Sequence, residues 1–284
     1  MAKILATDLD GTLLYPRKFF RCIPKKNVKF LRHWIDCGNK LVLVSSRGPK
    51  FMELLKEEIQ RDFDYISYTS SYIVSEGKVI KDESIDGSEM DTILHNINEN
   101  YHPLAYLMEL KDQPMLIKNL KVGTRLLIAF YKIYWFFQGK SREPYILSNK
   151  VFDDEIKKGK VYKVMVFFGL RKKNNKISKE INKNLREQFP DVESSWTSII
   201  NEITPKNCNK GEGLKYYCDY HKINHDDVYV VGDSGNDITM FNLFHEHSYA
   251  MAKAYPSVKK YARHTISRVY KLDKLVLEGE KNNE

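Results

Sequence analysis

Short apolar runs that end in polar loops and lead into amphipathic segments dominate both ends of this chain. Residues 3–14, KILATDLDGTLL, begin as such a run, and residues 40–48, KLVLVSSRG, repeat the pattern. Between them, residues 24–38 place apolar side chains at helical spacing behind Pro24 and stop at Gly38. Apolar runs of this length are typical of buried strands, and their alternation with helices is typical of parallel sheets. The sequence therefore predicts an α/β fold.

The alternation breaks off in the middle of the chain and resumes near its end. Between residues 84 and 200, predicted helices and strands follow no regular order, and one strand is predicted near 195–203. The regular pattern returns with DVYVVGD at 227–233, an apolar run that leads into acids. We therefore expect a core made of residues 1–83 and 201–284, interrupted by an inserted α+β domain at 84–200.

Composition narrows the class of protein. Of the 284 residues, 42% are hydrophobic and 29% are charged, as in ordinary globular proteins. The longest apolar stretch, residues 126–137, is interrupted by Lys132 and falls short of the ~20 residues that a spanning helix needs. The N-terminus leads directly into the first predicted strand without an apolar leader. We expect a cytoplasmic protein that does not contact membranes.

Cysteine spacing and charge distribution exclude two further classes of site. The four cysteines lie far apart and show no metal-ligand spacing, which argues against a zinc site or a disulfide framework. The net charge of +9 raises the question of nucleic-acid binding, but Lys and Arg are spread among Asp and Glu along the chain. We therefore expect no nucleic-acid partner.

Four polar sites lie where predicted strands end or predicted helices begin. The first is the pair Asp8 and Asp10, the second is Ser45, the third is Lys210, and the fourth is the segment 232–237. Because the carboxyl ends of parallel strands meet at one edge of a sheet, these sites can converge in space. Together they supply carboxylates, a hydroxyl and one ammonium group, which is a reactive combination.

The motifs at these sites resemble those of the haloacid dehalogenase superfamily. They are DLDGT at 8–12, a Ser at the end of the second strand, P-x-x-x-x-K-G from Pro205 to Gly211, and GDSGND at 232–237, in the family's order and spacing. The large insert and the segment AMAKAYPSVK at 250–259 are similar to Cof-type phosphatases with a type IIB cap. The resemblance implies a Rossmann-like core, an inserted cap, and Mg²⁺-dependent hydrolysis of a phosphomonoester.

The resemblance also implies a role for each matched residue. Asp8 would attack phosphorus and form an aspartyl-phosphate, and Asp10 would protonate the leaving oxygen and then activate water. Mg²⁺ prefers oxygen ligands, which suits the acids of this set. Gly11 and Thr12 would support the Asp8 loop. The catalytic candidates are Asp8, Asp10, Ser45 and Lys210; the phosphate-binding candidates are Leu9, Asp10, Ser45, Ser46, Arg47, Lys210 and Asn236; the metal candidates are Asp8, Asp10, Asp233 and Asp237.

Some positions have rivals or depart from the family pattern. Ser46 competes with Ser45 for the hydroxyl role, and Lys206 competes with Lys210 for the ammonium role. Cof-type relatives usually show Thr-Gly-Arg where this chain has Ser45-Ser46-Arg47, a change that keeps a hydroxyl. They often carry Asn-Gly-Ala where this chain has TSS at 69–71, and Asn where it has Lys253. The last two departures bear on substrate preference rather than on the reaction.

The implied substrate is a small phosphorylated metabolite, such as a sugar phosphate or a phosphorylated cofactor. Fold alone does not choose among such substrates. Two alternatives stay open: a phosphotransferase or phosphomutase of the phosphomannomutase type, and a non-enzymatic ligand sensor on the same fold. We expect a monomer or a homodimer. The aromatic segment 131–137 is a candidate for cap core, substrate contact or subunit interface.

Overall fold

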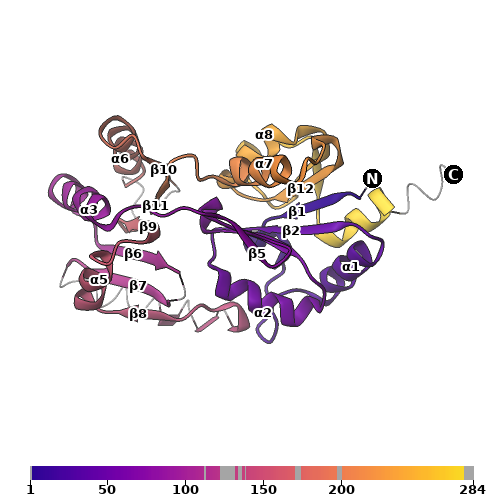
Figure 1. The fold of residues 1–284 in the computed structure, drawn as a ribbon, viewed down its shortest axis with the longest axis horizontal. Coiled ribbons are helices and arrows are strands. Elements are labelled where there is room, and N and C mark those ends of the chain that lie inside the picture. The colour runs from indigo at the N-terminus through magenta and orange to yellow at the C-terminus, as the bar shows by residue number, and fades with distance from the viewer. Residues whose placement is uncertain are drawn as a thin grey trace. The chain divides into compact units, whose positions relative to one another are not determined.

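The structure is a computed structural model that describes residues 2–111, 113–121, 132–133, 136–137, 139–169, 174–196 and 200–277. The chain forms two compact units (Figure 1). Unit 1 comprises Met1–Lys81, Gln138–Ser141 and Asn209–Glu284, and unit 2 comprises Asp82–Phe137 and Arg142–Cys208. Of the aromatic segment, Tyr131, Tyr134 and Trp135 lie outside the described residues, whereas Phe136 and Phe137 are exposed.

Unit 1 is built on an eight-stranded sheet in the order β14-β13-β12-β1-β2-β3-β4-β5. The pairs from β14 to β3 are parallel, and β4 pairs with β3 in the antiparallel direction. The sheet is the parallel one that the alternation predicts, with a short flap at one edge. Its strands are β1 (Ile4–Thr7), β2 (Lys40–Val44), β3 (Asp64–Ser67), β4 (Tyr72–Ser75), β5 (Lys78–Asp82), β12 (Val228–Gly232), β13 (Ser248–Met251) and β14 (His264–Ile266).

Helices cover both faces of this sheet, as Figure 1 shows. Successive side chains of a strand point to opposite faces. On β1, Leu5 therefore packs into the core formed with α1 (Lys25–Asp36) and α2 (Pro49–Ile59). Ile4 and Ala6 pack into a second core, which is formed with α7 (Lys210–His221), α8 (Ile238–Leu243) and α9 (Pro256–Lys259). A sheet buried on both faces explains the continuous apolar runs of the sequence.

Unit 2 is a six-stranded sheet with helices packed on one face. The strand order is β10-β11-β9-β6-β7-β8, and most neighbours are antiparallel. Helices α3 (Gly87–Tyr101), α5 (Asn149–Ile156) and α6 (Asn174–Gln188) share a core with this sheet. The unit has the α+β composition expected for the insert. Its strands are β6 (Ala105–Leu110), β7 (Met115–Asn119), β8 (Tyr145–Leu147), β9 (Val161–Phe167), β10 (Val192–Trp196) and β11 (Ile200–Pro205).

The end of the insert differs from the sequence-based expectation. One strand is predicted near 195–203, but the structure has two antiparallel strands there, β10 and β11. Because β11 pairs with β9 and buries Ile203 in the core of unit 2, residues 201–205 lie in this sheet and not in unit 1. The chain re-enters unit 1 at Asn209. No helix among the described residues combines the length and the apolar character that crossing a membrane requires.

Candidate active site

Asp8 is the first residue after β1 and continues the course of that strand. Its backbone N–H donates to the carbonyl of Val231 at 2.9 Å, which fixes the loop start against β12. The next residues, Leu9–Leu13, form a turn whose backbone is non-helical at Asp10 and Gly11, and its leucines are buried in the core of α1 and α2. Since the Leu9 side chain is fully buried, Leu9 offers a ligand only its backbone.

Gly11 allows the loops after β1 and β12 to approach each other closely. Its φ of +83° lies in the left-handed region, which other residues avoid. A Cβ atom at this position would lie 2.3 Å from Oδ2 of Asp233. Only glycine therefore lets the Asp8 loop and the Asp233 loop share this space.

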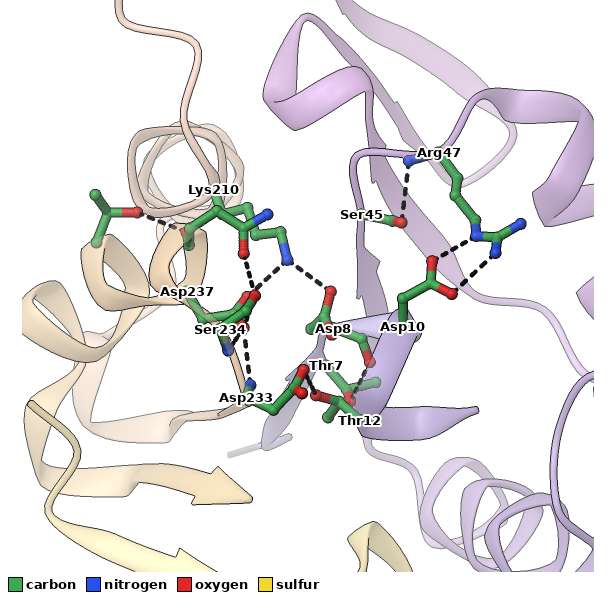
Figure 2. A network of polar contacts seen from close by, with 12 residues as sticks. Thr7, Asp8, Asp10, Thr12, Ser45, Arg47, Lys210, Asp233, Ser234 and Asp237 are labelled. Atoms are coloured by element: carbon green, nitrogen blue, oxygen red, sulfur yellow. Dashed lines mark hydrogen bonds and ion pairs between the residues drawn. The ribbon is translucent and has the colours of Figure 1, made fainter. Parts of the chain in front are cut away.

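Lys210 joins two of the carboxylates. It is the first residue of α7, directly after Asn209, whose side chain accepts a hydrogen bond from the backbone N–H of Glu212 and caps the helix. Its Nζ lies 2.6 Å from Oδ1 of Asp8 and 2.6 Å from Oδ1 of Asp237 (Figure 2). The lysine is 1% exposed. Its rival Lys206 is exposed and belongs to unit 2, so the structure brings Lys210 and not Lys206 to Asp8.

Asp237 is buried and both of its carboxylate oxygens have donors. Oδ1 accepts from Lys210, and Oδ2 accepts from the backbone N–H groups of Asp233 and Ser234 at 2.8 and 2.9 Å. The side-chain oxygen of Asn236 accepts a hydrogen bond from the Ser234 hydroxyl. These contacts fold the loop after β12 so that Asp233 faces Gly11.

Asp233 is held by one hydroxyl and one ammonium group. The Thr12 hydroxyl donates to its Oδ1 at 3.1 Å, and Nζ of Lys253 lies 3.0 Å from its Oδ2. Thr12 thus supports the Asp8 loop, as expected, by tying it to the loop after β12. The contact between Lys253 and Asp233 has no signal in the sequence beyond the departure from the family's Asn.

Asp10 is paired with arginine. Nε and a terminal nitrogen of Arg47 donate to its two oxygens at 2.6 and 2.9 Å, and Arg17 approaches one of them at 3.5 Å. The buried Ser45 hydroxyl accepts from the backbone N–H of Arg47 at 3.1 Å, whereas Ser46 is half-buried. Figure 2 shows the Asp10–Arg47 pair on one side of Asp8 and Lys210 on the other. Arg17 was not identified as a site residue from the sequence.

Burial and charge shift the protonation of these acids in opposite directions. Burial, with Asp237 and Asp233 nearby, raises the pKa of Asp8 to about 8, although Lys210 opposes the shift. Burial also raises the pKa of Asp233, against the effect of Lys253. For Asp10, burial acts to raise the pKa, but the hydrogen bonds and charge of Arg47 outweigh it and hold the pKa below its usual value. The lysines beside Asp8 and Asp233 therefore do not fully offset the burial of these two carboxylates.

The carboxylates can hold a metal ion. Oxygens of Asp8, Asp233 and Asp237 lie within 4.8 Å of one another. Oδ2 of Asp8 is buried and, among the described residues, has no hydrogen-bond partner. An all-oxygen donor set with an unsatisfied buried oxygen and raised pKa values fits a hard divalent cation.

The fold and the site together agree with a known family. The family model described as haloacid dehalogenase-like hydrolase matches residues 5–273. The chain belongs to this family. The match spans both units, so the insert that interrupts the parallel sheet is part of the family pattern and the core is Rossmann-like with a cap.

Curated relatives of this haloacid dehalogenase-like hydrolase cover nearly its whole length. MG125 of Mycoplasma genitalium is named as an inferred phosphatase. It is 26% identical to this chain, and the match covers 94% of this chain and 92% of MG125. YwtE of Bacillus subtilis, named 5-amino-6-(5-phospho-D-ribitylamino)uracil phosphatase, is 23% identical over 91% of this chain and 90% of its own.

Solved structures share the fold. SMU.1108c from Streptococcus mutans superposes with a TM-score of 0.78 at 19% identity, covering 98% of this chain and 100% of its own. The subclass IIB sugar phosphatase BT4131 gives a TM-score of 0.72 at 21% identity, covering 96% of this chain and 98% of its own. At these identities the likeness concerns the fold, a Cof-type core with a IIB cap.

Proposed function

We propose that this hydrolase is a Mg²⁺-dependent phosphatase that works through an aspartyl-phosphate on Asp8. One observation carries the proposal. Asp8 is buried at the carboxyl edge of the sheet with one oxygen on Lys210, and the other, Oδ2, has no partner in the part of the chain that the structure describes. A carboxylate held in this way presents one oxygen for attack on phosphorus while an ammonium group offsets the charge of the phosphate.

In the first half-reaction, Oδ2 of Asp8 forms a bond to phosphorus as the bond from phosphorus to the leaving oxygen breaks. The leaving oxygen takes a proton from Asp10 and departs as an alcohol. Lys210, which contacts Asp8 at 2.6 Å, offsets negative charge on the transferring group. Ser45, whose hydroxyl lies beside the Arg47 backbone, is proposed to donate to a phosphoryl oxygen.

In the second half-reaction, Asp10 as a carboxylate takes a proton from water. The water oxygen bonds to phosphorus, the bond to Asp8 breaks, and inorganic phosphate leaves. The Arg47–Asp10 pair favours the ionised form of Asp10, which this step needs. The first step needs the protonated form, so Asp10 must leave Arg47 or share it with the phosphate before it donates.

Asp8, Asp233 and the backbone carbonyl of Asp10 are proposed to hold Mg²⁺. Asp237 is proposed to support this site without contacting the metal directly, through its hydrogen bonds to the loop of Asp233. When bound, Mg²⁺ neutralises charge and orients the phosphate against Asp8. This chain's part is to supply buried carboxylates whose cost of burial Lys210 and Lys253 do not fully offset, as the raised pKa values of Asp8 and Asp233 indicate.

We further propose that unit 2 serves as a cap that contacts the part of the substrate remote from the phosphate. Two relatives support a small phosphorylated substrate: one is named a sugar phosphatase and the other a phosphatase of a phosphoribityl pyrimidine. A sugar phosphate or a phosphorylated cofactor is the proposed class. A cap that closes over the site would keep bulk water from the first half-reaction.

A screen of phosphorylated metabolites tests the proposal. Purified protein with Mg²⁺ should release inorganic phosphate from a subset of sugar phosphates or phosphorylated cofactors, and excess chelator should abolish the release. Transfer of phosphate to a second sugar hydroxyl, with a bisphosphorylated activator present, would instead identify a mutase. Full activity in chelator would overturn the metal assignment.

A further inference from the structure

The Asp233 carboxylate already has a cation beside it, supplied by the chain itself. Nζ of Lys253 lies 3.0 Å from Oδ2 of Asp233, while the other oxygen accepts from the Thr12 hydroxyl. The Asp233 side chain is 14% exposed and that of Lys253 is 34% exposed. The lysine therefore reaches the carboxylate from the solvent side, where its ammonium group can leave again.

Lys253 differs in this respect from Lys210. Lys210 is buried and shared between Asp8 and Asp237, so its ammonium group is a fixed part of the site. Lys253 is attached through a flexible four-carbon stem and, among the described residues, contacts a single carboxylate. The position also departs from the Asn expected of Cof-type relatives, and a neutral amide would leave Asp233 without this counter-charge.

We propose that Lys253 is an internal competitor for the divalent cation at Asp233. Its ammonium group occupies Oδ2 in the metal-free protein, and binding of the cation displaces it. The inference rests on the proposed function in that it takes Asp233 as a ligand of the metal. It goes beyond that function because it assigns to this chain a weakened affinity for the cation.

A neighbouring ring gives the displaced ammonium group a second partner. The ring centroid of Tyr15 lies 4.5 Å from Nζ of Lys253, a distance typical of a cation–π contact. The Arg268 guanidinium lies 4.6 Å from the same ring. Because a second cation already contacts this ring, Tyr15 alone is a poorer partner than Asp233. Lys253 therefore returns to Asp233 when the cation leaves.

Direct measurement of Mn²⁺ binding to the full chain without substrate tests the inference. Mn²⁺ serves as the probe, and its free fraction is read by electron paramagnetic resonance. Lys253→Met keeps the length of the side chain and removes its charge, and it should bind Mn²⁺ roughly two- to fivefold more tightly than the unmodified protein, since a partly exposed charged contact is worth about that factor. Lys259→Met is the matched control. Its ammonium group donates to the Ala252 carbonyl and contacts no carboxylate of the described residues, so the Kd of this variant for Mn²⁺ should stay unchanged.

Thermal unfolding supplies a second readout. Without metal, Lys253→Met should have a lower Tm than the unmodified protein, because Asp233 loses its counter-charge. On addition of saturating Mn²⁺, the Tm of Lys253→Met should rise by more than the Tm of the unmodified protein does. Lys259→Met should match the unmodified protein in both its metal-free Tm and its rise in Tm with Mn²⁺.

Asp233→Asn separates failure of the inference from failure of the proposed function. If Asp233→Asn weakens Mn²⁺ binding but Lys253→Met does not tighten it, the competition is wrong and the metal site stands. If Asp233→Asn leaves the Kd for Mn²⁺ unchanged, the metal assignment is wrong, and the competition falls with it.

Discussion

Asp8 and Asp10 stand two residues apart, yet they meet opposite partners in the folded chain. In an extended segment their side chains would point the same way. The turn at Gly11 separates them, so that Asp8 contacts Lys210 and Asp10 contacts Arg47. Burial raises the pKa of Asp8, whereas Arg47 lowers that of Asp10. Two carboxyl groups with pKa values pushed apart are suited to different roles in one reaction.

The raised pKa of Asp8 predicts a pH dependence of stability in the metal-free protein. Asp8 binds its proton more tightly in the folded protein than in the unfolded chain. The stabilisation from this difference, a term in the free energy of unfolding, is complete below the unfolded pKa of 3.8. The contribution is lost as the pH rises through the folded value of about 8. In chelator, the Tm should fall over this window, and Asp8→Asn should flatten the fall. A Tm profile identical in the two proteins would contradict the shift.

The Arg47–Asp10 pair predicts a titration change. Arg47→Met removes the donors that lower the pKa of Asp10, so that pKa should rise. Titration of ¹³C-labelled aspartate carboxyls by NMR checks this. Arg17→Met is the control and should shift the same resonance less, because Arg17 approaches Asp10 only at 3.5 Å from an exposed position. Equal shifts in the two variants would assign the effect to general charge instead.

At the scale of the residue, the sequence predicts that the acids and Lys210 converge, but it does not predict which acid each arginine or Lys253 contacts. Asp8 and Asp233 follow apolar runs, so the parallel sheet alone brings them to one edge. The partners of Arg17, Arg47 and Lys253 depend on where long, flexible side chains end in three loops. Neither spacing nor composition encodes that choice.

At the scale of the element, the conformation of the loop after β1 depends on Gly11. Gly11→Ala would place a methyl group 2.3 Å from Asp233 and strain a backbone with φ of +83°. We expect a loss of about 1–3 kcal/mol in the free energy of unfolding and loss of phosphatase activity.

Gly77→Ala is the control for Gly11→Ala. Its φ of +74° is similar, but beyond its chain neighbours no atom of the described residues lies within 4 Å of the added Cβ. It should cost about 1–2 kcal/mol from backbone strain alone and leave activity intact. Chemical denaturation and a phosphatase assay measure both variants. Equal activity in the two would show that the close approach to Asp233 is not needed.

The elements of unit 1 are predictable because their signals are strong, whereas those of unit 2 are not. Strands β1, β2 and β12 are buried on both faces and read as continuous apolar runs. Strands β10 and β11 carry Ser, Glu and Asn between apolar residues, and this pattern predicts only a single strand near 195–203. A half-buried sheet gives only a short alternation, which does not show where one strand ends and the next begins.

At the scale of the whole molecule, the proposed cap predicts that specificity and chemistry separate. Met165 and its strand neighbour Leu107 are half-buried on the face of the unit 2 sheet opposite its helical core. Met165→Lys should change KM and preference among phosphorylated metabolites, with a much smaller effect on p-nitrophenyl phosphate. Lys183→Ala, at an exposed position of α6, is the control and should change neither. If Met165→Lys abolishes both activities in a folded protein, unit 2 supplies catalytic groups.

In the proposed mechanism Asp8 carries the phosphoryl group, and Asp10 donates a proton to the leaving oxygen and then takes one from water. Asp10→Asn keeps the nucleophile but removes the base for water, so with an ester whose leaving group needs little protonation it should accumulate a phosphoenzyme. Rapid quench followed by borohydride reduction and mass spectrometry should then yield homoserine at position 8. Asp8→Asn, which removes the nucleophilic charge, should yield no adduct and no hydrolysis. A label at Asp10, or normal turnover by Asp8→Asn, would contradict the account.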